Sequence, residues 1–185
     1  MLHTKTITKK FNDFEKFYEL YLDAFPKSER APLAFLFQRA RKGIAKFDAY
    51  YDNDLFVGFT YTITVDDLTY LLYFAIKSDI RSKGYGAQIL RFLQEKYPNN
   101  RIILNIEAED ENAANSADRI RRRNFYLKNG YSLLPIYIKM NRNVFDVLVT
   151  GGTCTADEFS NLFKIYMGAL PFALYRPNIR ESAEI

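Results

Sequence analysis

The sequence predicts an α/β (α+β) protein with a mixed, mostly antiparallel sheet flanked by helices. Three observations lead to this prediction. Apolar residues make up 48% of the 185 residues, which is enough to bury a core. Strand-like runs rich in Val, Thr, Phe and Tyr are interspersed with segments whose apolar residues recur at helical spacing. No repeat or low-complexity linker interrupts the chain, so we expect a single domain over residues 1–185.

The first half of the chain is expected to combine two helices with four strands. The expected strands cover residues 3–11, 44–53, 54–65 and 69–76. The expected helices cover residues 12–25 and 28–43. Asn12 and Glu15 have capping-box spacing at the start of the first helix, and Gly43 is suited to end the second. Turns rich in Asp and Asn between the later strands favour antiparallel neighbours.

The second half alternates helices and strands. The expected helices cover residues 86–97 and 115–130, followed by a last helix that begins at Thr155. The expected strands cover residues 101–108, 131–140 and 143–150, of which the last two form a hairpin around Asn141. Thr155 has capping-box spacing to Glu158. The apolar residues of the last helix indicate core packing first, and a lid or dimer contact second.

The composition and charge of the chain limit which ligands and catalytic groups can be expected. The formal charge of +4 and the pI of about 9.0 mildly favour an anionic ligand, but without a localised basic patch they do not indicate nucleic acid. A single cysteine, Cys154, excludes an internal disulfide and a cysteine-based zinc site, and the single histidine, His3, is close to the N-terminus. We therefore expect no metal and no histidine catalysis. We find no signal peptide and no run of 18 apolar residues, so we expect a cytoplasmic protein without a membrane span.

A turn with two glycines, in IKSDIRSKGYGAQIL at residues 76–90, separates an expected strand from an expected helix. Gly84 and Gly86 would let the backbone approach a ligand closely, and the N–H groups at a helix start favour phosphate. Arg81 and Lys83 would add positive charge. The Walker A and dinucleotide-binding patterns are both absent. On spacing alone, a phosphate-binding turn and an ordinary charged turn both stay open.

Two separated motifs resemble the GCN5-related N-acetyltransferase (GNAT) family. RSKGYG, which starts at Arg81, matches the family signature [QR]-x-x-G-x-[GA]. NFYLKNGY, at residues 124–131, resembles the later FY-x-x-x-G-F element. FPKSERAPL, at residues 25–33, resembles the end of the family's first helix and the loop after it. The resemblance covers residues 1–150, and we interpret residues 151–185 as a C-terminal helical extension.

The resemblance implies the GNAT fold and a site for acetyl-CoA between two splayed central parallel strands, here residues 71–76 and 101–108. Main-chain groups of Phe74, Ala75 and Ile76 would pair with the pantetheine arm. Backbone N–H groups of the turn would hold the pyrophosphate. The cofactor-binding residues implied at the turn are Arg81, Ser82, Lys83, Gly84, Tyr85, Gly86 and Ala87.

The resemblance also assigns Tyr126 as the general acid that protonates the departing thiolate, a task that suits a neutral phenol. Helical spacing places Tyr126 on one face with Arg119, Arg122 and Arg123, so we expect nearby cations to lower its pKa. Many family members carry Asn and Ala where this chain has Arg119 and Arg122. These arginines could instead reach coenzyme phosphates or an acidic substrate. The alternative is a tyrosine that packs on the sheet beside solvated arginines.

A base must accept the proton of an attacking amine. Glu107 is our candidate, directly or through water, and Glu109 and Tyr73 are further candidates. The alternative is that these carboxylates face solvent or pair with the arginines.

The sequence thus predicts an acetyl-CoA-dependent N-acetyltransferase that acts directly on the amine of a small molecule or peptide, without a metal. A homodimer is compatible with this prediction. One alternative is a non-catalytic CoA-binding regulator or partner-binding protein on the same fold. Another is a nucleic-acid-binding module or a transferase that acts on charged tRNA. Cys154 is expected to be an inert thiol, because the sequence offers it no histidine partner.

Overall fold

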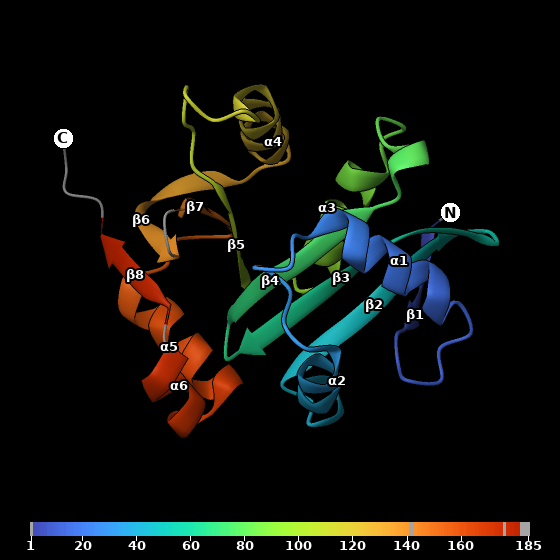
Figure 1. The fold of residues 1–185 in the computed structure, drawn as a ribbon, viewed down its shortest axis with the longest axis horizontal. Helices are drawn as coiled ribbons and strands as arrows, with labels where there is room; N and C mark the ends of the chain where they lie inside the picture. The colour runs from blue at the N-terminus through green and yellow to red at the C-terminus, as the bar shows by residue number, and fades with distance from the viewer. Residues whose placement is uncertain (1, 141–142, 176, 182–185) are drawn as a thin grey trace. The chain divides into compact units, whose positions relative to one another are not determined.

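The computed structural model describes residues 2–140, 143–175 and 177–181, and Figure 1 shows its fold. The strands follow the order β1-β2-β3-β4-β5-β7-β6-β8, and β4 and β5 are the parallel pair of this mostly antiparallel sheet. Contacts divide the chain into two compact units, Met1–Thr64 with Leu71–Lys96 and Val65–Tyr70 with Tyr97–Ile185. No helix in the described ranges is long and apolar enough to cross a membrane. The predicted fold class is confirmed.

The elements from β1 to α3 lie mainly in the first unit. They are β1 (Leu2–Thr6), α1 (Phe14–Ala24), α2 (Leu33–Arg41), β2 (Ala45–Asp52), β3 (Leu55–Val65), β4 (Leu68–Ile76), the 3-10 turn η1 (Ser78–Ile80) and α3 (Tyr85–Lys96). β1 pairs with β2, and β2 pairs with β3, both in antiparallel register. The expected strands and helices of this half are therefore present, and the structure adds η1.

Aromatic side chains dominate the core of the first unit. The ring of Phe17 in α1 contacts Phe47 and Phe59 edge-on, with centroid distances of 4.9 and 5.0 Å. A second buried cluster comprises Tyr50, Val57, Ile80 and Ile89. Phe47 and Tyr50 lie three residues apart in β2 and belong to different clusters, as expected for side chains that alternate across a strand. The turn before α3 is thereby anchored to the core through Ile80.

The start of α1 differs from the prediction. Asp13, and not Asn12, is the N-cap residue, and its side chain makes no capping hydrogen bond. The Asp13 carboxylate instead accepts a hydrogen bond from the Tyr51 hydroxyl at 2.6 Å and pairs with Lys16 at 2.7 Å. A tertiary contact therefore replaces the expected capping box. The end of α2 agrees with the prediction, because Gly43 follows it with a φ of 75°.

The second unit contains the remaining elements. They are β5 (Arg101–Glu107), α4 (Ser116–Lys128), β6 (Ser132–Met140), β7 (Asn143–Thr150), α5 (Ala156–Met167), α6 (Ala169–Tyr175) and β8 (Asn178–Glu181). Leu68–Tyr70 of β4 belong to this unit and pair in parallel with Arg101–Ile103 of β5. The predicted hairpin is confirmed by the antiparallel register of β6 and β7, which brings Met140 opposite Asn143. Its predicted turn residue, Asn141, lies outside the described residues.

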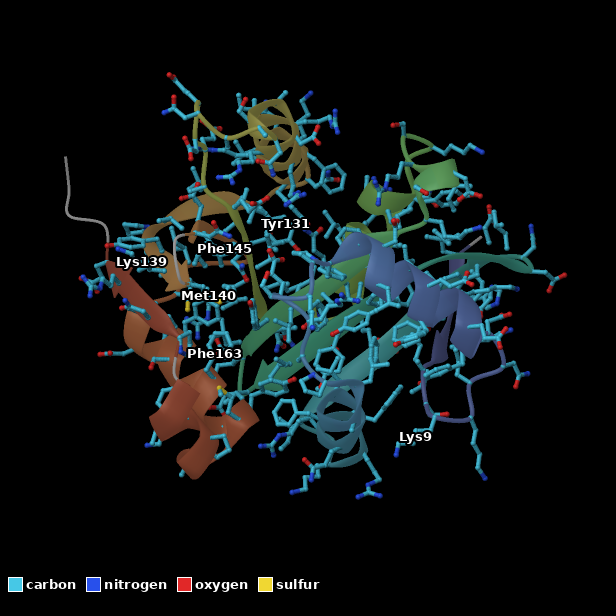
Figure 2. The ribbon with its side chains drawn as sticks, in the orientation of Figure 1. Lys9, Tyr131, Lys139, Met140, Phe145 and Phe163 are labelled. Carbon is cyan, nitrogen blue, oxygen red and sulfur yellow. The ribbon has the colours of Figure 1, made fainter. Side chains whose placement is uncertain are left out.

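The C-terminal extension is part of the second unit and packs within it. Thr155 and Glu158 form the predicted capping box, and α5 buries Phe159, Leu162 and Tyr166. The Tyr70 ring contacts Phe159 and Phe163 with centroid distances of 4.9 and 5.3 Å, and Figure 2 labels Phe163. Core packing, our first interpretation of this helix, is confirmed. The extension is not only helical, however, because β8 adds an antiparallel strand to β6.

Candidate functional site

The residues predicted to bind the cofactor lie in the first unit, at the end of β4 and the start of α3. Ser82 and Gly84 have φ values of 64° and 84°, so the backbone turns through the left-handed region twice before α3 begins. The N–H of Gln88 donates to the Gly84 carbonyl at 3.2 Å, which places the residues between them in the first helical turn. Ser82, Lys83 and Gly84 are exposed.

The first turn of α3 presents backbone N–H groups at the positive end of the helix dipole. Gly86 lies within this turn, whereas Gly84 lies in the loop before it. The two glycines therefore have different roles. Gly84 is needed for its positive φ, while Gly86 leaves the first turn without a side chain. Such a surface can bind a phosphate group through the main chain.

Side chains fix this turn to the neighbouring elements. The Arg81 Nε donates to the Ile76 carbonyl at 3.2 Å, so the signature arginine ties the turn to the end of β4. The Tyr85 hydroxyl donates to Asp52 at 2.9 Å. We had expected the main chain of Ile76 to pair with a pantetheine arm. Its carbonyl already accepts a hydrogen bond from Arg81, so pairing through this group requires the arginine to share the oxygen or move away.

Gly58 in β3 is a residue that our site prediction missed. A Cβ atom at this position would lie 2.1 Å from the carbonyl oxygen of Ala75 and 3.0 Å from the Cα of Ile76. The lack of a side chain therefore lets β3 lie against the end of β4 that we predict to bind pantetheine. A glycine inside a strand-like run is the sequence signal for such a close approach.

A cluster of charged residues lies in the second unit, between the end of β5 and α4. Glu107 pairs with Arg119 at 3.0 Å and with Arg122 at 3.5 Å. Its Oε2 also accepts a hydrogen bond from Asn115 Nδ2 at 3.1 Å. The side chains of Glu107 and Arg119 are only 16% and 14% exposed. The pairing with arginines, which we had left open as an alternative, is therefore present for Glu107.

The other arginines of α4 are paired as well. Arg123 lies 3.2 Å from Glu109 and 4.0 Å from Asp146, and Arg121 pairs with Asp118 at 2.8 Å. Burial raises the pKa of Asp146, which Arg123 opposes. These contacts neutralise much of the arginine run, so α4 offers little support for a nucleic-acid patch.

Tyr126 is the buried residue of α4, with 8% of its surface exposed. Burial raises its pKa to about 12, and Arg122 lowers it by less. Arg122 thus acts in the expected direction, but desolvation of the phenol outweighs this charge, so the net shift of the pKa is upward. Ile120 and Leu127, in contrast, are 47% and 40% exposed. The tyrosine, and not these two apolar residues, forms the inner side of the helix.

Tyr131 follows α4 and packs against Tyr126. Their ring centroids lie 5.8 Å apart at an interplanar angle of 73°. The N–H of Tyr131 donates to the carbonyl of Tyr126 at 3.2 Å. Tyr131 is the last residue of the second motif, NFYLKNGY. The sequence gives no signal that its hydroxyl is buried.

Tyr73, one of the three candidate bases, serves as an anchor in the first unit. Its hydroxyl donates to the Glu29 carbonyl at 2.8 Å and accepts from the Ala31 N–H at 2.9 Å. The Tyr21 hydroxyl lies 3.5 Å away. Burial raises the pKa of Tyr73. The hydrogen-bonding capacity of this phenol is thus used to hold the loop after α1.

Cys154 is buried, and burial raises the pKa of its thiol to about 11. The thiolate that would act as a nucleophile is therefore scarce at neutral pH, as expected for an inert thiol. Among the residues that the structure describes, no three His, Cys, Asp or Glu side chains are grouped so that they could hold a metal ion.

Comparisons with known proteins agree with the fold. Residues 14–131 match the acetyltransferase (GNAT) family. A GNAT-family protein from Bacteroides thetaiotaomicron is 24% identical, with a TM-score of 0.70 over 91% of this chain and 97% of its own. A Bacillus subtilis acetyltransferase in complex with CoA is 16% identical, with a TM-score of 0.56 over 81% and 98%.

An aminoglycoside 6'-N-acetyltransferase from Enterococcus faecium is 15% identical, with a TM-score of 0.60 over 80% of this chain and 96% of its own. At these identities the structural likeness shows the fold alone. No curated protein matches the chain.

Proposed function

The chain belongs to the acetyltransferase (GNAT) family, and we propose that it transfers the acetyl group of acetyl-CoA directly to the amine of a small molecule or peptide. The observation that carries this proposal is the main-chain turn from Ser82 to Ala87. Two residues with left-handed φ values lead into a helix whose first turn contains Gly86, and the residues just before this helix, 82–84, are exposed. This surface fits a pyrophosphate, which is the anionic centre of CoA.

The residues of the first unit would hold the co-substrate. The N–H groups of the turn would bind the pyrophosphate, with Lys83 adding charge, and the end of β4 at Phe74–Ile76 would pair with the pantetheine arm. Acetyl-CoA would supply the activated acetyl group as a thioester. The position of Gly58 supports this assignment, since it allows β3 to support the end of β4 at close range.

Tyr126 would supply the proton for the departing thiolate. With a pKa of about 12, it is almost fully protonated at pH 7 and is available as a donor. The same pKa makes it a weak acid toward a thiolate, because a thiol has a pKa of about 8.5. Proton transfer therefore needs additional stabilisation of the phenolate, and Arg122 supplies part of it.

The geometry ranks the candidate bases. A carboxylate has about four acceptor sites, and the contacts with Arg119, Arg122 and Asn115 use up to three of those on Glu107. One site stays available for a water or an amine proton, so we propose Glu107 as the base. Glu109 ranks second. Tyr73 ranks last, because its hydroxyl already donates and accepts.

A panel of amines tests this function. Acetyl-CoA is incubated with the protein and with polyamines, aminoglycosides, amino acids or peptides, and the release of free CoA thiol is followed. We expect at least one amine to raise thiol release well above the rate without acceptor, with an acetylated amine found by mass spectrometry. Thiol release that no amine accelerates, although CoA binds, would contradict the proposed transfer.

CoA binding without amine-dependent thiol release would instead support a non-catalytic CoA-binding protein. One observation favours this second candidate, namely that Glu107 is already engaged with two arginines and an amide. A substitution separates the two functions. Tyr126→Phe should leave CoA affinity unchanged in both cases, but only in an enzyme should it lower a measurable transfer rate.

A further inference from the structure

The Tyr131 hydroxyl is buried without a hydrogen-bond partner. Only 3% of the residue is exposed, and its oxygen makes no hydrogen bond within the part of the chain that the structure describes. A buried polar group that forms no hydrogen bond destabilises the folded state, and the great majority of such groups have a partner. The ring alone would fill this position equally well. The presence of this hydroxyl therefore indicates that it forms a hydrogen bond with a ligand, a water or a neighbouring group during the reaction.

Tyr126 is the neighbour that this hydroxyl can serve. Tyr131 lies between the end of α4 and the start of β6, and Figure 2 labels it. The two rings meet edge to face, and the backbone hydrogen bond at 3.2 Å fixes the two residues relative to each other. The Tyr126 ring is buried as well, and its pKa is shifted by burial and by Arg122, with no hydrogen bond among the causes. Two buried phenols thus lie side by side in the second unit, and the hydroxyl of one of them, Tyr131, has no partner among the described residues.

We propose that Tyr131 is a positioning residue for Tyr126, whose hydroxyl oxygen accepts a hydrogen bond from the Tyr131 hydroxyl, directly or through one water, as Tyr126 gives up its proton. This inference rests on the proposed function. In the step, the O–H bond of Tyr126 breaks and an S–H bond forms on the departing thiolate. Tyr131 keeps its proton throughout, and bulk solvent later reprotonates Tyr126.

This contact addresses the weakness of Tyr126 as an acid. Burial opposes formation of a phenolate, and a hydrogen bond donated to the phenolate oxygen favours it. Arg122 acts in the same direction through its charge. The hydrogen bond from Tyr131 stabilises the reacting state more than the resting state, because only the phenolate of Tyr126 accepts a charge-assisted hydrogen bond. The missing partner in the resting protein is consistent with this difference.

A double-mutant cycle tests the proposal in the full-length chain. Tyr131→Phe, Tyr126→Phe and the double variant are compared for thiol release from acetyl-CoA, with the best amine of the panel, or with water as the acceptor where no amine is active. We expect Tyr131→Phe to lower kcat about tenfold without changing the KM for acetyl-CoA. In the Tyr126→Phe background, the same change should alter kcat by less than about twofold, because the group through which Tyr131 acts is absent.

Thermal unfolding distinguishes this role from a structural one. Tyr131→Phe removes a hydroxyl without a partner, so its melting temperature should equal or exceed that of the wild type. Tyr61→Phe is the matched control, since the Tyr61 hydroxyl is buried and donates to the Leu36 carbonyl at 3.0 Å. This control should lower the melting temperature and leave kcat unchanged.

Two results would overturn the proposal while the acid role of Tyr126 stands. They are a Tyr131→Phe variant with wild-type kcat, and a tenfold loss that persists in the Tyr126→Phe background. If Tyr126→Phe itself retains full kcat, the acid assignment fails and the positioning role fails with it. CoA binding by the wild type, measured separately, then shows whether the remainder of the proposed function survives.

Discussion

Replacing Glu107 by Gln tests whether the charged cluster at α4 both stabilises the second unit and accepts a proton. The substitution keeps the size of the side chain and one acceptor oxygen. It removes the negative charge that Arg119 and Arg122 contact at 3.0 and 3.5 Å. Arg119 would keep its hydrogen bonds to Asn115 and to the Ala108 carbonyl, and its contact with residue 107 would become a hydrogen bond to a neutral oxygen.

The expected loss of stability follows from the exposure of the partners. A hydrogen bond to a charged group contributes about 1.5–3 kcal/mol, and the neutral one that Gln can still form contributes about 0.5–1.5 kcal/mol. Arg119 and Glu107 are both largely shielded from solvent, so this difference should appear nearly in full. Arg122 is half exposed and adds about 0.5 kcal/mol or less. Glu107→Gln should therefore reduce the free energy of unfolding by about 1–2 kcal/mol.

Urea denaturation measures this loss, and Glu109→Gln is the control. Glu109 is 45% exposed and pairs with Arg123 at 3.2 Å, so its substitution should cost about 0.5 kcal/mol. Equal losses for the two variants would refute the claim that Glu107 anchors α4. The pH profile of kcat/KM then tests the base. If Glu107 accepts the proton, the loss in Glu107→Gln should shrink at high pH, whereas an equal loss at every pH would assign Glu107 to anchoring alone.

Three further substitutions give direct tests. Gly58→Ala should destabilise the protein by about 3 kcal/mol and weaken CoA binding, because its Cβ would meet the Ala75 carbonyl; a normal urea midpoint would show that β3 and β4 are less tightly packed than described. Tyr126→Phe should lower kcat about 10²-fold with unchanged CoA affinity in calorimetry, and a normal kcat would make this tyrosine structural. Asp146→Asn should raise the melting temperature at pH 7. The pKa of Asp146 is raised in the folded state, so ionisation of this carboxyl group destabilises the folded protein at pH values above that pKa. The gain in melting temperature should therefore become smaller as the pH falls toward 3.8, the ordinary pKa of the group. No gain at pH 7 would mean that the Arg123 contact outweighs burial.

Local patterns predicted the elements well, because strand alternation and helical spacing reflect which side of each element is buried. The second capping box was correct at Thr155, where the partner Glu158 is local. The capping box predicted at Asn12 was wrong. Asp13 is the N-cap residue instead, and its carboxylate accepts a hydrogen bond from Tyr51, which is far away in the sequence. The terminal strand β8 was missed, since a four-residue strand carries too little pattern to be recognised.

The candidate site was predictable where it depends on backbone conformation. The glycine pattern placed a turn between a strand and a helix, and the structure has this turn between β4 and α3, with a positive φ at Gly84. The environment of Tyr126 was not predictable in the same way. The helix sequence indicated that arginines favour a lower pKa, and Arg122 does so. The extent of burial, which raises the pKa by more, depends on packing that the helix sequence alone does not contain. The hydroxyl of Tyr131 was missed for the same reason.

The central claim is that the turn before α3 binds the pyrophosphate of CoA, and calorimetric titration of CoA into the wild type and Gly86→Val tests it most directly. Valine at the first turn of α3 would place a branched side chain where the phosphates approach, without requiring a positive φ. Gln88→Val is the matched control, because Gln88 is an exposed residue near the start of the same helix. We expect the wild type and Gln88→Val to bind CoA alike and Gly86→Val to bind at least tenfold more weakly, a difference of about 1.4 kcal/mol. Equal affinity for all three proteins, or no binding by the wild type, would contradict the account.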